Sequence, residues 1–96
     1  EPTAKQFELL NCYPNPFNSM ITLSYYTNLK KDISITIYDF NGKYIKSIIN
    51  YALTPGTQTV RWDGTDQFSR PVAAGMYLYL IEGVGSRQSG KMIYLK

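Results

Sequence analysis

Apolar and polar residues alternate along several stretches of the chain. The three clearest stretches and their apolar residues are 20–26 with Ile21, Leu23 and Tyr25, 32–39 with Ile33, Ile35 and Ile37, and 57–62 with Val60 and Trp62. A period of two is typical of β-strands that bury one face and leave the other in water. Because parallel sheets are covered on both faces, this pattern favours an antiparallel arrangement.

Turn-forming residues divide the alternating stretches into separate strands. The strongest signal is Asn41-Gly42, because both residue types tolerate the positive φ that a two-residue type I′ turn requires. This turn would join 32–39 to a strand at 44–49. Further turns are expected at 54–56 and 83–90.

Additional strands are expected near 7–11, at 75–82 and, as the last element, at 91–96. Apolar residues at a helical spacing are not found in any stretch of the sequence. We therefore predict an all-β fold, a small antiparallel β-sandwich of the immunoglobulin-like type with about seven strands. Its predicted core consists of Ile21, Leu23, Ile33, Ile35, Ile37, Val60, Trp62 and Leu78.

Residues 12–18 read CYPNPFN and stiffen the backbone between two predicted strands. Each proline fixes its own φ, lacks an N–H and holds the residue before it in an extended conformation. We expect a rigid connector whose phenylalanine closes one end of the core, and a direct binding role is the less favoured alternative. The motif consists of Pro14, Asn15, Pro16 and Phe17.

Ninety-six residues correspond to one domain with a core of its own. Residues 1–8 are polar around Pro2 and are interpreted as a linker, and residues 9–96 as the domain. The chain begins with Glu1 instead of methionine, so we expect it to be part of a longer protein. The longest apolar run, 76–81, is far shorter than the roughly 18 residues of a membrane helix.

Charge and residue types exclude several classes of function. The net charge is +3, but the basic residues are scattered and only Lys30 and Lys31 are adjacent, so nucleic acid is not an expected partner. Since the sequence has no histidine and one cysteine, it cannot form a Cys/His nucleophilic pair, a histidine-containing zinc site or an intrachain disulfide. Cys12 is interpreted as a small buried apolar residue.

The segment 62–75 contains the only acidic residues in a suggestive arrangement, Asp63 and Asp66. Their spacing does not match a calcium loop, which needs six to eight oxygen ligands. Two acids on one surface loop also resemble the carboxylate pair of a glycosidase, but no cleft is evident. We favour an Asx turn at Asp63-Gly64 after Trp62, and predict no catalytic residue, no metal and no cofactor.

Tyrosine is abundant, with nine residues among 96. Tyr26, Tyr38 and Tyr44 fall on predicted outer faces and could stack on sugars. The alternative is that they only fill half-buried strand surfaces, as aromatic residues do in sheets of any function. The second interpretation is favoured.

Four motifs resemble one known family, the C-terminal sorting domains (type A) of the bacterial type IX secretion system. The motifs are YPNPFNSMITLSYY at 13–26, ITIYDFNGKYIKSI at 35–48, GTQTVRWDGTDQFSRPVAAGMYLYLI at 56–81 and SGKMIYLK at 89–96. The part from Trp62 to Ile81 is equally similar to the immunoglobulin-like domain of flagellar hook-capping proteins. The sequence departs from the pattern at Ser69, where glycine is common, and at Cys12 in the connector.

The resemblance implies a non-catalytic domain that acts as the secretion signal of a larger exported cargo protein. Its partners would be outer-membrane translocon and sortase components and the upstream cargo domains. The route would lead through the periplasm to the surface or medium of a Gram-negative bacterium, where a sortase would exchange the domain for a lipopolysaccharide anchor. The implied recognition residues are Gly75, Tyr77, Lys91, Met92, Ile93, Tyr94, Leu95 and Lys96.

A terminal strand at a sheet edge would present unpaired backbone groups to a receptor, which gives this resemblance a mechanism. The alternative function is a structural or carbohydrate-binding β-sandwich module attached to a secreted enzyme. Whether residue 96 ends the natural protein would distinguish the two.

Overall fold

The computed structural model describes residues 7–27, 32–51, 56–83 and 86–96. These residues form seven strands and no helix, as the alternation predicts. The strands are β1 (Phe7–Tyr13), β2 (Ile21–Thr27), β3 (Asp32–Asp39), β4 (Tyr44–Tyr51), β5 (Gly56–Trp62), β6 (Gly75–Gly83) and β7 (Ser86–Tyr94).

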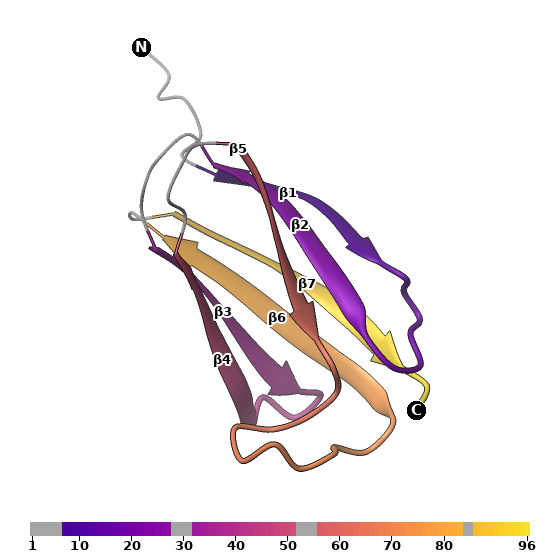
Figure 1. Cartoon of the computed structure of the whole chain (residues 1–96). Coiled ribbons are helices and arrows are strands. Elements are labelled where there is room, and N and C mark those ends of the chain that lie inside the picture. The colour runs from indigo at the N-terminus through magenta and orange to yellow at the C-terminus, as the bar shows by residue number, and fades with distance from the viewer. Residues whose placement is uncertain (1–6, 28–31, 52–55, 84–85) are drawn as a thin grey trace.

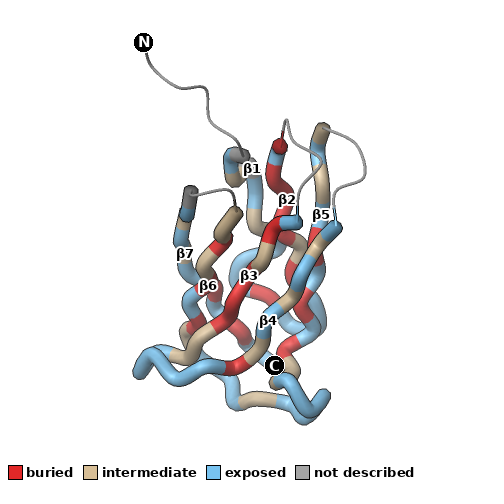
Figure 2. Tube along the Cα trace, turned by 90° about the vertical axis from the view of Figure 1, so that its left-hand side faces the viewer, coloured by how far each residue is buried: buried red, intermediate tan, exposed pale blue. Residues whose placement is uncertain are grey.

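The strands make two antiparallel sheets that face each other (Figure 1). One sheet has the order β1-β2-β5 and the other has the order β4-β3-β6-β7. Each sheet turns one face toward the other, so the buried positions lie between the two layers (Figure 2). The predicted immunoglobulin-like β-sandwich is confirmed.

The core contains seven of the eight residues that the sequence predicts. Among these, Ile21, Leu23 and Trp62 are at most 1% exposed. The other correctly predicted core residues are Ile33, Ile35, Ile37 and Val60. The alternation in 20–26, 32–39 and 57–62 is therefore the alternation between core and solvent.

The prediction that Leu78 belongs to the core is wrong, because its side chain is 37% exposed. Every residue from 76 to 81 is apolar, so the pattern of this strand does not reveal its inner face. Pairing with β3 decides the matter, since Tyr79 lies opposite Ile37 and Ile81 opposite Ile35. Tyrosines and Ile81 therefore occupy the core positions of β6, and Leu78 lies on the outer face of the sheet.

The turn between β3 and β4 also differs from the prediction. Gly42 has a φ of 85°, but Asn41 does not have a positive φ, so the turn is not type I′. The Gly42 N–H donates to the Asp39 carbonyl at 3.0 Å, and the Asp39 N–H donates to the Lys43 carbonyl at 2.9 Å. The Asp39 carboxylate accepts the N–H groups of Asn41 and Lys43, which stabilises a three-residue loop ending in a left-handed glycine.

The last strand is longer at its start than predicted. Residues 86–90 were expected in a turn, but they belong to β7 and pair with β6. Gly90 lies opposite Tyr79, and a Cβ at this position would collide with the Tyr79 ring and hydroxyl. This glycine makes room for a buried tyrosine within the sheet, so it does not mark a turn.

The predicted linker 1–8 falls mostly outside the described residues. Phe7 and Glu8 belong to β1, and Glu8 is exposed. The turn predicted at 54–56 also lies outside the described residues except for Gly56, the first residue of β5.

Candidate functional site

Six of the eight predicted recognition residues lie in the terminal strand β7 or follow it directly as Leu95 and Lys96, and the β7 side chains point alternately inward and outward. Met92 is 0% exposed and Tyr94 is 7% exposed, so both belong to the core. Ile93 is 40% exposed and Leu95 is 54% exposed. Lys91 and Lys96 are exposed as well, so the predicted signal divides into core residues and surface residues.

The other two predicted recognition residues have different surroundings. Gly75 is exposed, has a φ of 148° and begins β6 opposite Tyr94. Tyr77 is 5% exposed, and its hydroxyl donates to the Ala73 carbonyl at 2.5 Å. Burial and the negative charge of Asp39 raise the pKa of Tyr77. Tyr77 therefore packs in the core, and its hydroxyl holds the loop before β6.

The proline segment covers the outer edge of the terminal strand. The Asn15 side chain donates its amide to the Lys91 carbonyl at 3.1 Å and accepts the Ile93 N–H at 2.9 Å. The Phe17 backbone donates to the Ile93 carbonyl at 2.9 Å and accepts the Leu95 N–H at 2.7 Å. The expected row of unpaired backbone groups between Lys91 and Leu95 is therefore occupied by the chain itself.

Phe17 anchors this cover in the core, as the sequence predicts. Its side chain is 1% exposed, and its ring stacks on Tyr94 with ring centres 4.9 Å apart. Trp62 lies against both rings, at 5.7 Å from Phe17 and 6.2 Å from Tyr94. The connector between β1 and β2 thus lies beside the end of β7 (Figure 1). The peptide bonds before Pro14 and Pro16 are cis.

The pairing of Asn15 with the terminal strand escaped the sequence analysis. Its partners lie 76 and 78 residues away in the chain, and no local pattern connects them. An asparagine between two prolines presents an amide NH2 group and an amide carbonyl on a rigid backbone. This was the local sign that its side chain could pair with another segment.

The loop 63–74 closes one end of the sandwich. The Asx turn predicted at Asp63-Gly64 is not found there, and one forms at Asp66 instead. The Asp66 carboxylate accepts the N–H groups of Phe68 and Arg70 and the Arg70 guanidinium. These hydrogen bonds lower the pKa of Asp66. Asp63 instead accepts the Thr65 hydroxyl, and the Trp62 indole N–H donates to the Thr65 carbonyl at 2.8 Å.

Ser69 and Gly64 both adopt left-handed backbone conformations in this loop. Ser69 has a φ of 63°, which explains why glycine suits the position. Gly64 has a φ of 76°, and its carbonyl accepts the Val72 N–H at 3.0 Å. Among the described residues, no group of three acidic or cysteine side chains is arranged to hold a metal ion.

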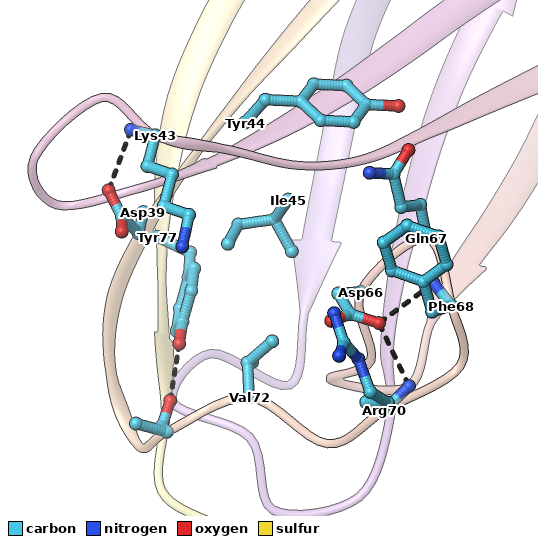
Figure 3. A pocket seen from close by; sticks show the side chains of 11 residues that line it. Asp39, Lys43, Tyr44, Ile45, Asp66, Gln67, Phe68, Arg70, Val72 and Tyr77 are labelled. Atoms are coloured by element: carbon cyan, nitrogen blue, oxygen red, sulfur yellow. Dashed lines mark hydrogen bonds and ion pairs between the residues drawn. The ribbon is translucent and has the colours of Figure 1, made fainter.

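A cavity of about 490 Å³ opens between the β3–β4 turn and this loop (Figure 3). Ile45 and Val72 lie in its centre, with Tyr77 on one side and the Asp66–Arg70 ion pair on the other. The carboxylates and the Tyr77 hydroxyl are engaged in holding the surrounding turns. These three groups thus serve the structure of this end of the sandwich.

The three tyrosines considered for sugar stacking do not form one platform. Tyr26 is 44% exposed on the three-stranded sheet, whereas Tyr38 and Tyr44 belong to the other sheet. The rings of Tyr38 and Tyr44 meet edge to face at 6.5 Å. The three rings therefore do not form one continuous aromatic surface.

Comparison with known families decides which of the two functions the domain has. Residues 11–95 match the family model of the secretion system C-terminal sorting domain. The chain belongs to this family. The resemblance of its four motifs to type IX sorting domains is therefore confirmed, and the domain is the sorting signal of an exported cargo protein.

Solved structures share the fold of this sorting domain. Dimeric latent PorU from Porphyromonas gingivalis is 24% identical over 92% of this chain and 9% of its own, with a TM-score of 0.70. PorZ, a surface component of the type IX secretion system of the same bacterium, is 18% identical over 90% of this chain and 11% of its own, with a TM-score of 0.63. FlgD from Xanthomonas campestris, which caps the flagellar hook, is 19% identical over 93% of this chain and 62% of its own, with a TM-score of 0.64.

The sorting domain spans about a tenth of the length of PorU and PorZ. No curated protein sequence matches it. Sorting implies interaction with the secretion machinery and export of the cargo to the cell surface or beyond, and it requires no catalysis by residues 11–95. In the part of the chain that the structure describes, no helix is long and apolar enough to span a membrane.

Proposed function

We propose that the type IX translocon at the outer membrane recognises the folded domain through exposed side chains of its terminal strand and of the two residues that follow it. These side chains, here called the terminal row, are Lys91, Ile93, Leu95 and Lys96. The observation that carries the proposal is the exposure of two large apolar side chains, 40% for Ile93 and 54% for Leu95, between two lysines. Such residues lose contact with water when a partner covers them, which favours binding.

The terminal row continues onto the neighbouring strand. Ile93 lies opposite Met76, and Lys91 lies opposite Leu78. Leu78 is 37% exposed on the outer face of the sheet, where it does not contribute to the core. Its exposed position fits a role in this surface. Exposed apolar residues flanked by cations form a compact patch of the kind that partner proteins bind.

Recognition by side chains is favoured over strand capture at this place. Asn15 and Phe17 occupy the outer backbone groups from Lys91 to Leu95, so a receptor strand would have to displace them. Side chains of the terminal row need no such displacement.

The steps of export before and after recognition are proposed from the resemblance to the family. The cargo would reach the periplasm, cross the outer membrane, and lose this domain to a sortase that attaches the cargo to a surface lipopolysaccharide. The upstream domains of the same polypeptide would be the cargo, and their activity is independent of the sorting domain.

The test is export of a reporter fused to residues 1–96 in a bacterium with a matching type IX system. Deleting residues 91–96 would also remove Met92 and Tyr94 from the core, so it would not distinguish recognition from folding. The double variant Ile93→Ser/Leu95→Ser changes exposed residues only. We expect it to accumulate in the periplasm while the purified domain keeps its melting temperature within a few degrees.

The matched control is Phe40→Ser/Phe68→Ser, which removes two aromatic side chains that are 69% and 65% exposed outside the terminal row. This control should be exported like the parent. Normal export of the Ile93→Ser/Leu95→Ser variant would refute recognition through the terminal row.

A further inference from the structure

The second edge of the four-stranded sheet is formed by β4, and its outer backbone groups can be assigned from the hydrogen-bond pattern. The Asp39 N–H points toward β4, since it donates to the Lys43 carbonyl. Peptide groups alternate along a strand, so those of Ile37, Ile35 and Ile33 also point toward β4. Their partners in β4 are Lys46, Ile48 and Asn50. The alternate residues of β4 therefore direct their peptide groups away from the sheet. These residues are Ser47, Ile49 and Tyr51.

This outer edge is covered only at its start. The Gln67 N–H donates to the Ile45 carbonyl at 3.0 Å. Beyond this contact, no hydrogen bond within the described residues reaches the outer peptide groups of Ser47 or Ile49. The register with β3 is regular from Lys46 to Tyr51, so no bulge bends the edge away.

The open edge also lacks the features that normally protect one. Residues 47–51 contain neither proline nor a charged side chain. The nearest charged residue along the chain, Lys46, is half-buried and donates to the Thr65 hydroxyl at 3.1 Å. On β3, Asp32 lies opposite Tyr51, at the last position of the edge. Ile49 is 54% exposed and Tyr51 is 65% exposed on this strand.

The other edges are treated differently. The edge of β7 is covered by Asn15 and Phe17 near its end. On the edge of β1, the Leu9 N–H donates to the Gln88 side chain. The edge strand β5 exposes threonines and Arg61 instead of large apolar side chains. The β4 edge thus differs from those of β5 and β7, because it combines exposed apolar side chains with outer backbone groups that no described residue covers.

We infer that the edge of β4 from Ser47 to Tyr51 binds an extended, uncharged segment of a partner protein, which adds an antiparallel strand to the sheet. Outer N–H and carbonyl groups recur about every 7 Å along this edge, a spacing that only an extended peptide matches. Apolar side chains at alternate positions of the segment would pack beside Ile49 and Tyr51. The lack of charge at 47–51 disfavours a charged segment, because its charges would lose water without gaining partners.

This inference is independent of the proposed function, since the terminal row and the β4 edge belong to opposite margins of the sheet. The test uses the isotope-labelled chain and a capped synthetic peptide of alternating threonine and valine residues. We expect the peptide to shift the amide resonances of Ser47, Ile49 and Tyr51 and to slow their hydrogen exchange. The same peptide with all amides N-methylated should not bind.

Two variants and one control make the result specific. Ile49→Pro removes one outward N–H, which an edge strand tolerates, and Ile49→Lys adds a protective charge. Each should weaken peptide binding by about tenfold or more. Thr59→Lys, at an exposed position of β5, should leave it unchanged.

Three results would overturn the inference. One is a set of shifted resonances outside β4, and a second is equal binding by the parent and Ile49→Pro. The third is concentration-dependent shifts of the same amides without peptide, because the occupant would then be a second copy of this chain.

Discussion

At the residue scale, the neighbours of a glycine in space decide whether a residue with a Cβ could replace it. Gly64 and Gly42 both have a positive φ, 76° and 85°. A Cβ on Gly64 would lie 2.7 Å from the Tyr94 ring, whereas a Cβ on Gly42 would have no atom within 4 Å. Both glycines have a left-handed backbone conformation, but only Gly64 has a neighbouring side chain in the way of a Cβ. Substitution of Gly42 therefore tests backbone strain alone, and substitution of Gly64 tests strain together with steric overlap.

We expect Gly42→Ala to cost about 1–2 kcal/mol, the price of a left-handed conformation for alanine. Gly64→Ala should cost roughly 2–5 kcal/mol, because displacement of the packed Tyr94 ring adds about 1–3 kcal/mol. Urea unfolding of both variants measures the difference. Equal losses would show that Tyr94 moves aside freely.

At the element scale, the proline segment acts as an additional partner of the terminal strand. It lies beside β7 in a parallel bridge from Phe17 to Tyr94 and satisfies four backbone groups of that strand. An uncovered terminal edge would invite pairing with other chains during export. The segment thus stabilises the end of the fold and protects it.

We expect Asn15→Ala to destabilise the domain by about 1–3 kcal/mol, because two hydrogen bonds of about 0.5–1.5 kcal/mol each are lost. The Ile93 amide, which donates to the Asn15 side chain, should exchange its hydrogen faster. Asn18→Ala is the matched control, since Asn18 is exposed in the same segment. Equal effects of the two substitutions would contradict the assigned role of Asn15.

At the scale of the whole molecule, formation of the sandwich buries several weakly acidic groups. Burial raises the pKa of Cys12 from 9.0 to about 11 and that of Tyr79 from 10.0 to about 12. Burial also raises the pKa of Tyr25. Each of these groups keeps its proton longer in the folded state than in the unfolded state.

Stability should therefore decline at alkaline pH. A raised pKa contributes stability that is fully present below the unfolded value and is lost as the pH rises through the folded value. For Cys12 this window runs from pH 9.0 to about 11. Urea unfolding across this window should show a steeper loss for the parent than for Cys12→Ala. Identical slopes would show that the thiol titrates equally in both states.

The sequence alone determined the fold class, about half of the core and the family. Alternation in 20–26, 32–39 and 57–62 was sufficient because each of these strands has one polar face, and a polar face identifies the apolar one. The closure of the core by Phe17 was also predictable, since two prolines restrict the conformations of the segment around it.

Tertiary structure decided the features that depend on contacts between segments distant in the chain. The inner face of β6 depends on its register with β3, because residues 76–81 are all apolar. The type of the β3–β4 turn depends on the Asp39 carboxylate, which competes successfully with the intrinsic preference of Asn41-Gly42. The occupied edge of β7 and the open edge of β4 depend on contacts between distant segments, and those contacts determine which surfaces a partner can reach.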